Sequence, residues 1–182
     1  MHPMTAENLR SAYGGESMAH MRYMIWADKA EKDGFPNVAR LFRAVSFAEQ
    51  AHATGHFNVM KDVAGGFPVV AGGGFGIGTT SQNLQGAIDG ESFEIAEMYP
   101  AYLTVAEAQG ERAAVVSMTR AVSAEKIHAA MYATAKKAVD AGKDAAFGPL
   151  QICPVCGHTI DGEAPDKCPV CSTLKNRFKT FA

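Results

Sequence analysis

Apolar residues recur with the period of an α-helix up to about Lys143. The first helix is expected to run from an N-cap at Thr5 to the turn at Asp33-Gly34-Phe35-Pro36, whose proline suits the first turn of a second helix. That second helix is expected to end at Ala64-Gly65-Gly66. The first part of the chain therefore predicts a helical hairpin.

The stretch from Gly65 to about Ser81 is rich in glycine and has no period. We interpret it as the long crossover that some helical bundles need between their halves. A phosphate-binding glycine loop is the alternative, but it lacks a preceding strand and a following Gly-Lys-Ser/Thr. Two further helices are expected at about 82–109 and 111–141, and Pro100 should open the first of these locally because it frees the carbonyl of Ala96.

The two halves of the helical region repeat each other. Gly15-Glu16-Ser17 recurs as Gly90-Glu91-Ser92, and Arg43-Ala44-Val45-Ser46 recurs as Arg120-Ala121-Val122-Ser123. Such a repeat implies two pseudo-symmetric hairpins packed face to face. We therefore expect residues 1–146 to form an all-α four-helix bundle, with equivalent residues converging near its axis.

Carboxylates and histidines interrupt the apolar stripes at equivalent places in both halves. A single such residue is often solvated at the edge of a stripe, but several unpaired carboxylates facing one core would repel each other and lose hydration. No Lys or Arg lies on these faces, so cations are expected to neutralise them. A Glu on two helices and Glu-x-x-His on the other two is the di-iron or di-manganese pattern, here formed by Glu16, Glu49, His52, Glu91, Glu125 and His128.

Three further residues are candidates for roles at this site. Glu94 lies one turn after Glu91 and has no counterpart in the first half, where Ala19 stands. Tyr23 and Tyr99 are expected to donate hydrogen bonds to ligand carboxylates, with plain core packing as the alternative. Other polar residues near the stripes are expected at the surface, outside the ligands or past the metal layer: His20, His56 and Glu97.

The four cysteines form two C-x-x-C pairs, Cys153-Pro154-Val155-Cys156 and Cys168-Pro169-Val170-Cys171. Four thiolates at this spacing predict a tetrahedral site for zinc or a single iron. Phe147-Gly148-Pro149 is the expected linker, so residues 150–182 should form a separate small metal module.

The charge and hydropathy of the chain argue against general nucleic-acid binding and against a membrane protein. The net charge of −2 provides no general attraction to nucleic acid or anionic lipid. No apolar run approaches the roughly 20 residues that span a bilayer. The first residues show no export signal, so we expect a cytoplasmic protein whose cysteines bind metal rather than form disulfides.

The chain resembles rubrerythrins over nearly its whole length. The matching motifs are Gly15-Glu16-Ser17, Glu49-Gln50-Ala51-His52, Gly90-Glu91-Ser92-Phe93-Glu94, Met98-Tyr99-Pro100, Glu125-Lys126-Ile127-His128 and the cysteine pairs, which also resemble rubredoxin. The resemblance implies a ferritin-like di-iron domain fused to a rubredoxin-like domain, with Glu94 added to the six ligands above. The longer glycine-rich stretch at 72–78 is a departure from the family pattern.

The resemblance also implies an activity and its partners. It implies a peroxidase for oxidative-stress defence that reduces hydrogen peroxide to water and is a homodimer or larger assembly. Its cofactors would be two iron ions in the bundle and one in the four-cysteine site, with zinc as a possible substitute. Electrons would come from an NAD(P)H-linked reductase or a rubredoxin.

A formal charge count suggests a role for Glu94. The charge of two ferrous ions is balanced by Glu16, Glu49, Glu91 and Glu125, whereas oxidation favours one more carboxylate. We therefore hypothesise that neutral His52 is exchanged for Glu94 at one iron on oxidation, as the family resemblance also suggests.

Two other functions compete with a peroxidase. A ferritin-like ferroxidase or iron store would not need the fused cysteine module or Glu94. A zinc-ribbon interaction module on a structural bundle would leave the buried carboxylates unexplained.

The position of the linker predicts an assembly. Glu125 and His128 lie more than a dozen residues before the end of their helix, which is some 20–30 Å at roughly 1.5 Å per residue. A module docked at its own helix end would be too distant for fast electron transfer. We therefore expect a head-to-tail homodimer, with the module of one subunit beside the Glu16/Glu91 site of the other.

Overall fold

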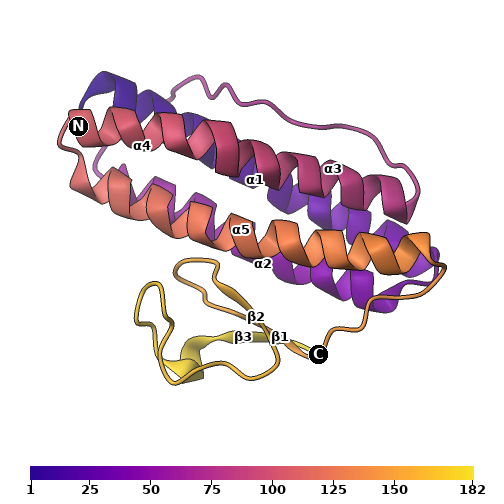
Figure 1. Ribbon diagram of the computed structural model, residues 1–182. Coiled ribbons are helices and arrows are strands. Elements are labelled where there is room, and N and C mark those ends of the chain that lie inside the picture. Colours follow the sequence, from indigo (N-terminus) through magenta and orange to yellow (C-terminus); the bar gives the residue numbers. More distant parts are fainter.

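Two long helical hairpins pack together, and a small sheet lies beside them (Figure 1). This computed structural model describes residues 1–182. The first hairpin consists of α1 (Pro3–Lys32) and α2 (Pro36–Val59), and α5 (Arg112–Asp140) is the last helix of the bundle. The predicted four-helix architecture is confirmed.

The third helix of the bundle is broken where Pro100 predicts an opening. It consists of α3 (Thr80–Phe93), a π-helical turn η1 (Glu94–Met98) and α4 (Tyr99–Ala108). Proline cannot donate the backbone hydrogen bond that a regular α-helix requires at its position. The π-turn widens the helix just before the proline, and such turns occur frequently at functional sites.

Two predicted helix ends are wrong. The first helix begins at Pro3 with His2 at the N-cap, because proline fits the first turn of a helix. Thr5 is instead buried, and its Oγ1 donates to Gln109 Oε1 at 2.6 Å. The second helix ends at Val59, before the predicted Ala64.

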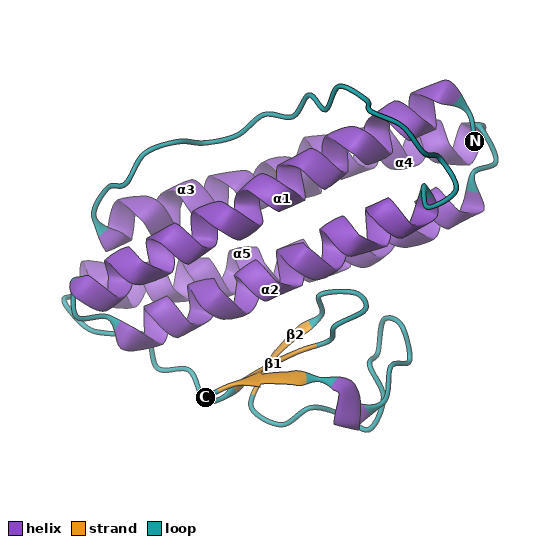
Figure 2. Cartoon of the chain, turned by 180° about the vertical axis from the view of Figure 1, so that it is seen from behind, coloured by secondary structure: helices purple, strands orange, loops and turns teal.

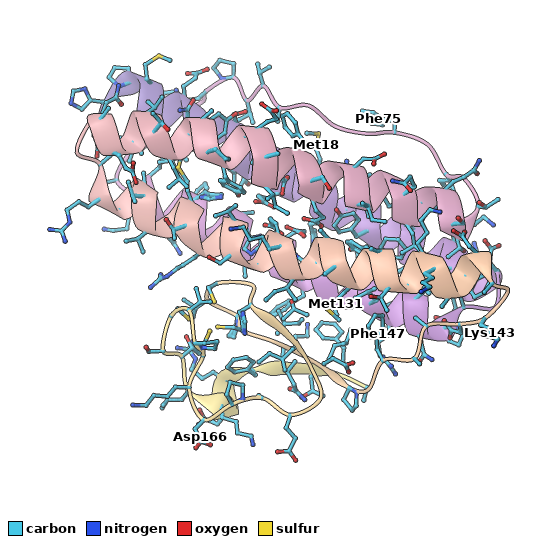
Figure 3. All side chains as sticks on the ribbon, in the orientation of Figure 1. Met18, Phe75, Met131, Lys143, Phe147 and Asp166 are labelled. Carbon is cyan, nitrogen blue, oxygen red and sulfur yellow. The ribbon has the colours of Figure 1, made fainter.

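The glycine-rich crossover between α2 and α3 runs along the outside of the bundle, over α1 and α3 (Figure 2). The indole of Trp26 donates to the carbonyl of Gly76 at 3.0 Å. A Cβ on Gly14 would lie only 2.5 Å from Val69, so glycine lets this part of the crossover approach α1. Figure 3 shows Phe75 on its outer side, where the side chain is 95% exposed.

Apolar side chains form two clusters in the bundle. The larger contains Tyr23, Phe42 and Tyr132 toward the end where α2 begins. The smaller contains Leu9, Tyr99 and Met118 toward the other end. The polar residues singled out in the sequence lie between the two clusters.

The C-terminal module is a three-stranded antiparallel sheet with the order β2-β1-β3. Its strands are β1 (Leu150–Ile152), β2 (Thr159–Asp161) and β3 (Lys179–Phe181), with a short 3-10 turn η2 (Lys175–Arg177) before β3. Leu150 and Ile152 are fully buried in the larger cluster of the bundle. The module therefore packs against its own bundle through a shared apolar core.

The linker turns the module back along α2 and α5, as Figures 1 and 3 show. The Asp144 carboxylate accepts from the backbone N–H of Asn37 at 2.8 Å and of Val38 at 3.2 Å, where α2 needs acceptors. The guanidinium of Arg40 donates to the carbonyls of Phe147 and Gly148. These contacts direct the chain away from the end of α5.

The path of the linker shows that the distance expected between the module and its own bundle was too large. We expected the module to stay at the end of its own helix, far from Glu125 and His128. It lies instead beside the middle of its own bundle, so no second subunit is needed to bring it near these residues. A head-to-tail homodimer stays a prediction, without that argument in its favour.

Candidate metal centres

Six ligand candidates form one polar layer across the middle of the bundle. Each is at most 3% exposed. Every helical segment that lines the layer contributes: α1 provides one glutamate, α3 provides another, and α2 and α5 each provide a glutamate and a histidine. The residues are Glu16, Glu49, His52, Glu91, Glu125 and His128.

These side chains divide into two groups of potential ligands. Glu16 and His52 belong to one group and Glu91 and His128 to the other, while Glu49 and Glu125 belong to both. In each group, one ligand atom from every residue lies within 4.8 Å of the others. Two adjacent sites that share two carboxylates form the arrangement of a dinuclear centre.

Both histidines turn Nδ1 toward the carboxylates. Nδ1 of His52 and Nδ1 of His128 each lie 2.7 Å from an oxygen of Glu125. Their Nε2 atoms point outward, toward the Cys156 carbonyl at 3.2 Å and the Thr159 hydroxyl at 2.9 Å. An outward Nε2–H fixes the tautomer that leaves Nδ1 free to bind a metal.

The buried carboxylates fit a pair of cations. Glu16 Oε2 and Glu49 Oε1 are buried without a hydrogen-bond partner. Burial and then repulsion from Glu125 raise the pKa of Glu49 well above its ordinary value, and burial and then Glu49 do the same to the pKa of Glu91. Bound cations would offset the loss of hydration and the mutual repulsion of the ionised carboxylates. A set of carboxylate and imidazole ligands suits iron or manganese.

Two buried tyrosines hold the outer oxygens of this layer. Tyr23 donates to Glu91 Oε1 at 2.8 Å, and Tyr99 donates to Glu16 Oε1. Both tyrosines therefore donate to carboxylates of the layer, as the sequence predicted. They orient carboxylates that come from the two helices without a Glu-x-x-His motif.

Glu94 lies outside both groups, at the first position of the π-turn. It is half-buried and lines a cavity of about 700 Å³ beneath the crossover, together with Arg22, Trp26 and Tyr102. Burial and then the nearby Glu16 raise the pKa of Glu94 well above its ordinary value. Ligation by Glu94 therefore stays a hypothesis that needs its side chain to move.

The four cysteines come together at the tip of the module. Sγ of Cys153 lies 3.4 Å from that of Cys171, and Sγ of Cys156 lies 3.5 Å from that of Cys168. A tetrahedral metal with bonds of about 2.3 Å to sulfur separates its sulfurs by about 3.8 Å. The cluster is therefore already close to the size that one such ion requires.

The first cysteine pair directly contacts the ligand layer. His52 lies within hydrogen-bond distance of the Cys156 carbonyl, and a Cβ on the next residue, Gly157, would lie 2.1 Å from His52 Nε2. Gly157 also has a φ of 70°, which favours glycine. The close approach of the two centres therefore requires glycine at this position.

The sequence interpretation missed a role for His56. It belongs to neither ligand group, yet it is fully buried, and its ring lies 2.9 Å from Tyr99 Oη and 3.0 Å from Ser117 Oγ. Burial lowers the pKa of His56 to about 4, so the ring is neutral near pH 7. Its spacing of four residues from His52 put both on one helical face, which was the available signal.

His20 and Glu97 also lie outside both groups, in agreement with the sequence. The ring of His20 contacts Ser46 at 2.8 Å, and Glu97 is exposed.

Comparison with known proteins agrees with this geometry. The rubrerythrin family model matches residues 7–136, and the model for the rubredoxin-like domain of rubrerythrin matches residues 151–179. The chain belongs to the rubrerythrin family. It is similar to Rubrerythrin-2 of Clostridium acetobutylicum, at 48% identity over 98% of this chain and 97% of that protein. Nigerythrin of Nitratidesulfovibrio vulgaris is 35% identical over 97% of this chain and 86% of its own length.

Solved structures extend the comparison to the fold. Fully reduced, all-ferrous nigerythrin superposes with a TM-score of 0.86 at 32% identity, covering 100% of this chain and 88% of that one. Reduced symerythrin from Cyanophora paradoxa, at 19% identity and a TM-score of 0.65, shares the fold. The ferritin-like bundle with a rubredoxin-like domain is confirmed, and with it a di-iron carboxylate site and a rubredoxin-like cysteine cluster. None of the helices has the length and hydropathy of a membrane span.

Replacing Gly157 with alanine should loosen the module from the bundle. The new Cβ would collide with His52 Nε2 and strain a left-handed backbone conformation. We expect faster proteolysis in the linker around residues 143–149 and a larger radius of gyration in X-ray scattering.

Gly162→Ala is the matched control. Gly162 also has a positive φ, of 100°, but nothing lies within 4 Å of its Cβ position. If both variants behave alike, backbone strain within the module explains the effect, and the contact with His52 does not hold the module in place.

Proposed function

We propose that this protein is a peroxidase that reduces hydrogen peroxide to water with electrons delivered through its four-cysteine centre. The observation that carries the proposal is the contact between His52 and the Cys156 carbonyl. An iron-storage protein would not need an electron-carrying centre whose backbone is hydrogen-bonded to a proposed metal ligand. When bound, an iron pair supplies two electrons to the peroxide O–O bond.

We assign the six residues of the polar layer as ligands of that pair and the four cysteines as ligands of a single iron. Glu49 and Glu125 would each hold both ions, because only they belong to both groups. Tyr23 and Tyr99 hold Glu91 and Glu16 by hydrogen bonds. Zinc remains chemically compatible with the four thiolates.

The cavity beneath the crossover is the proposed entrance for peroxide. It lies under the crossover and extends to Glu94. Glu94 lies in the cavity wall, and we propose that it would take the place of His52 as a ligand when the metal pair is oxidised. His52 would then stay hydrogen-bonded to Cys156.

Removal of a bridging carboxylate should empty the bundle of metal. Glu49→Ala or Glu125→Ala takes one ligand from both sites at once. Metal analysis should show loss of both helical ions, while the absorption bands of the four-cysteine iron persist as an internal control. Full occupancy of the bundle in either variant would disprove the ligand assignment.

The reaction with oxidants separates a peroxidase from an iron store. The ferrous protein should be oxidised much faster by hydrogen peroxide than by dioxygen in stopped-flow absorption. Glu94→Ala should slow the reaction with peroxide, and Glu97→Ala, which alters an exposed glutamate of the same π-turn, should not. Faster oxidation by dioxygen together with growth of a mineral core would favour a ferroxidase.

The docking of the module within one chain predicts electron transfer in the same chain. A mixture of Cys153→Ser and Glu49→Ala proteins should then stay inactive after subunit exchange, because neither chain has both centres. The electron donor would be a separate reductase or rubredoxin that reaches the module. Turnover restored in verified mixed dimers would instead support the head-to-tail homodimer.

A further inference from the structure

A chain of buried hydrogen bonds leads from the surface to Glu16. Ser117 Oγ lies 3.0 Å from His56 Nδ1, and His56 Nε2 lies 2.9 Å from Tyr99 Oη. Tyr99 in turn donates to Glu16 Oε1. The sequence brings these groups from α5, α2, α4 and α1, so only the folded bundle assembles the chain.

The donors of this chain all point toward Glu16. An ionised carboxylate only accepts, so the single phenolic proton of Tyr99 is directed to Glu16. The Tyr99 oxygen must then accept from His56 Nε2–H. A neutral ring protonated on Nε2 has an acceptor at Nδ1, and Ser117 can donate to it.

The outer end of the chain lies at a groove. Ser117 is half-buried and lines a cavity of about 600 Å³ between α2, α5 and the first cysteine pair. Gly55 also lines the groove, next to Ser117, and a Cβ there would lie 3.1 Å from the Ser117 hydroxyl. Glycine at this position therefore leaves room beside the hydroxyl on the groove side.

We propose that Ser117, His56 and Tyr99 form a proton relay that delivers protons from this groove to the di-metal site at Glu16. The inference rests on the proposed function, because reduction of one hydrogen peroxide to two waters consumes two electrons and two protons. The electrons come from the four-cysteine centre, and a solvent acid in the groove supplies each proton.

One passage through the relay moves four protons by one hydrogen bond each. The solvent acid protonates Ser117 Oγ, Ser117 passes its own proton to His56 Nδ1, and His56 passes its Nε2 proton to Tyr99. Tyr99 then passes its phenolic proton to Glu16. Glu16 gives that proton to an oxygen of the peroxide that is being reduced, and is ionised again before the second passage. The two hydroxyls then rotate back. His56 returns to its first tautomer by releasing the Nδ1 proton to solvent in the groove and taking one from solvent on Nε2, which leaves the number of protons unchanged and resets the chain.

The relay separates the paths of the reactants. The groove at Ser117 is also lined by His52 and Cys156, so protons and electrons arrive from the side that faces the module. Peroxide arrives from the opposite side, beneath the crossover, where Glu94 lines the cavity.

The tautomer of His56 tests the direction of the chain without any turnover. In zinc-loaded protein of verified metal content, long-range nitrogen–proton NMR correlations should show a neutral His56 ring protonated on Nε2. A ring protonated on Nδ1, or on both nitrogens, would overturn the inferred direction.

Variants at the outer end test proton delivery in the iron protein. Ser117→Val and Ser117→Thr introduce side chains of the same shape, and only threonine keeps a hydroxyl. Ser117→Val should slow oxidation of the ferrous protein by peroxide about tenfold and change its solvent deuterium isotope effect. Ser117→Thr should restore both, with the metal content equal in the two proteins.

His56→Gln tests the middle of the relay, because an amide can keep hydrogen bonds but passes protons poorly. It should slow the same step at least as much as Ser117→Val does, whereas His20→Gln, which alters another histidine paired with a serine, should not. Equal rates and isotope effects in wild type, Ser117→Val and His56→Gln would overturn the relay. A wild-type protein that does not react with peroxide would overturn the proposed function, and the tautomer of His56 would still decide the direction of the chain.

Discussion

Buried glutamates in one layer repel one another, and each has lost the hydration that stabilises its charge. In this bundle the layer lies between two apolar clusters, and the salt bridges of Glu16, Glu49 and Glu125 are all to histidines. Bound metal cations would stabilise such a layer while its carboxylates are ionised. The histidines turn Nδ1 toward the carboxylates, and the two tyrosines donate to Glu91 and Glu16, so the whole layer presents oxygen and nitrogen atoms that suit a pair of metal ions.

The second constraint is the close approach of the cysteine module. Leu150 and Ile152 bury the first strand of the module in the core of the bundle, and Asp144 and Arg40 hold the linker that leads to it. Gly157 then lets the backbone of the first cysteine pair reach His52. The outward Nε2 of His52, a ligand candidate, is thereby the contact between the bundle and the cysteine pair, so docking of the module also orients the His52 ring.

The faces of the ligand layer are chemically different. Toward the crossover lies a cavity with Glu94 and the cationic Arg22, and the π-turn gives this part of the helix its unusual backbone. Toward the module lie His52, the Cys156 carbonyl and the outer end of the chain through His56. The six ligand candidates obey the pseudo-symmetry of the two hairpins. Glu94 and the hydrogen-bonded chain through His56 do not, because each occurs in one half only.

The sequence by itself determined the helices, the ligand candidates and the metal-binding character of the cysteines. These features are local or repetitive: apolar periodicity, Glu-x-x-His spacing and paired C-x-x-C motifs each act within a few residues, and the internal repeat showed which of them should converge. The path of the module, the role of His56 and the position of Glu94 were decided by the tertiary structure alone. Each depends on contacts between residues far apart in the chain, such as Asp144 with Asn37 and Ser117 with His56, and no local pattern specifies which distant side chains will meet.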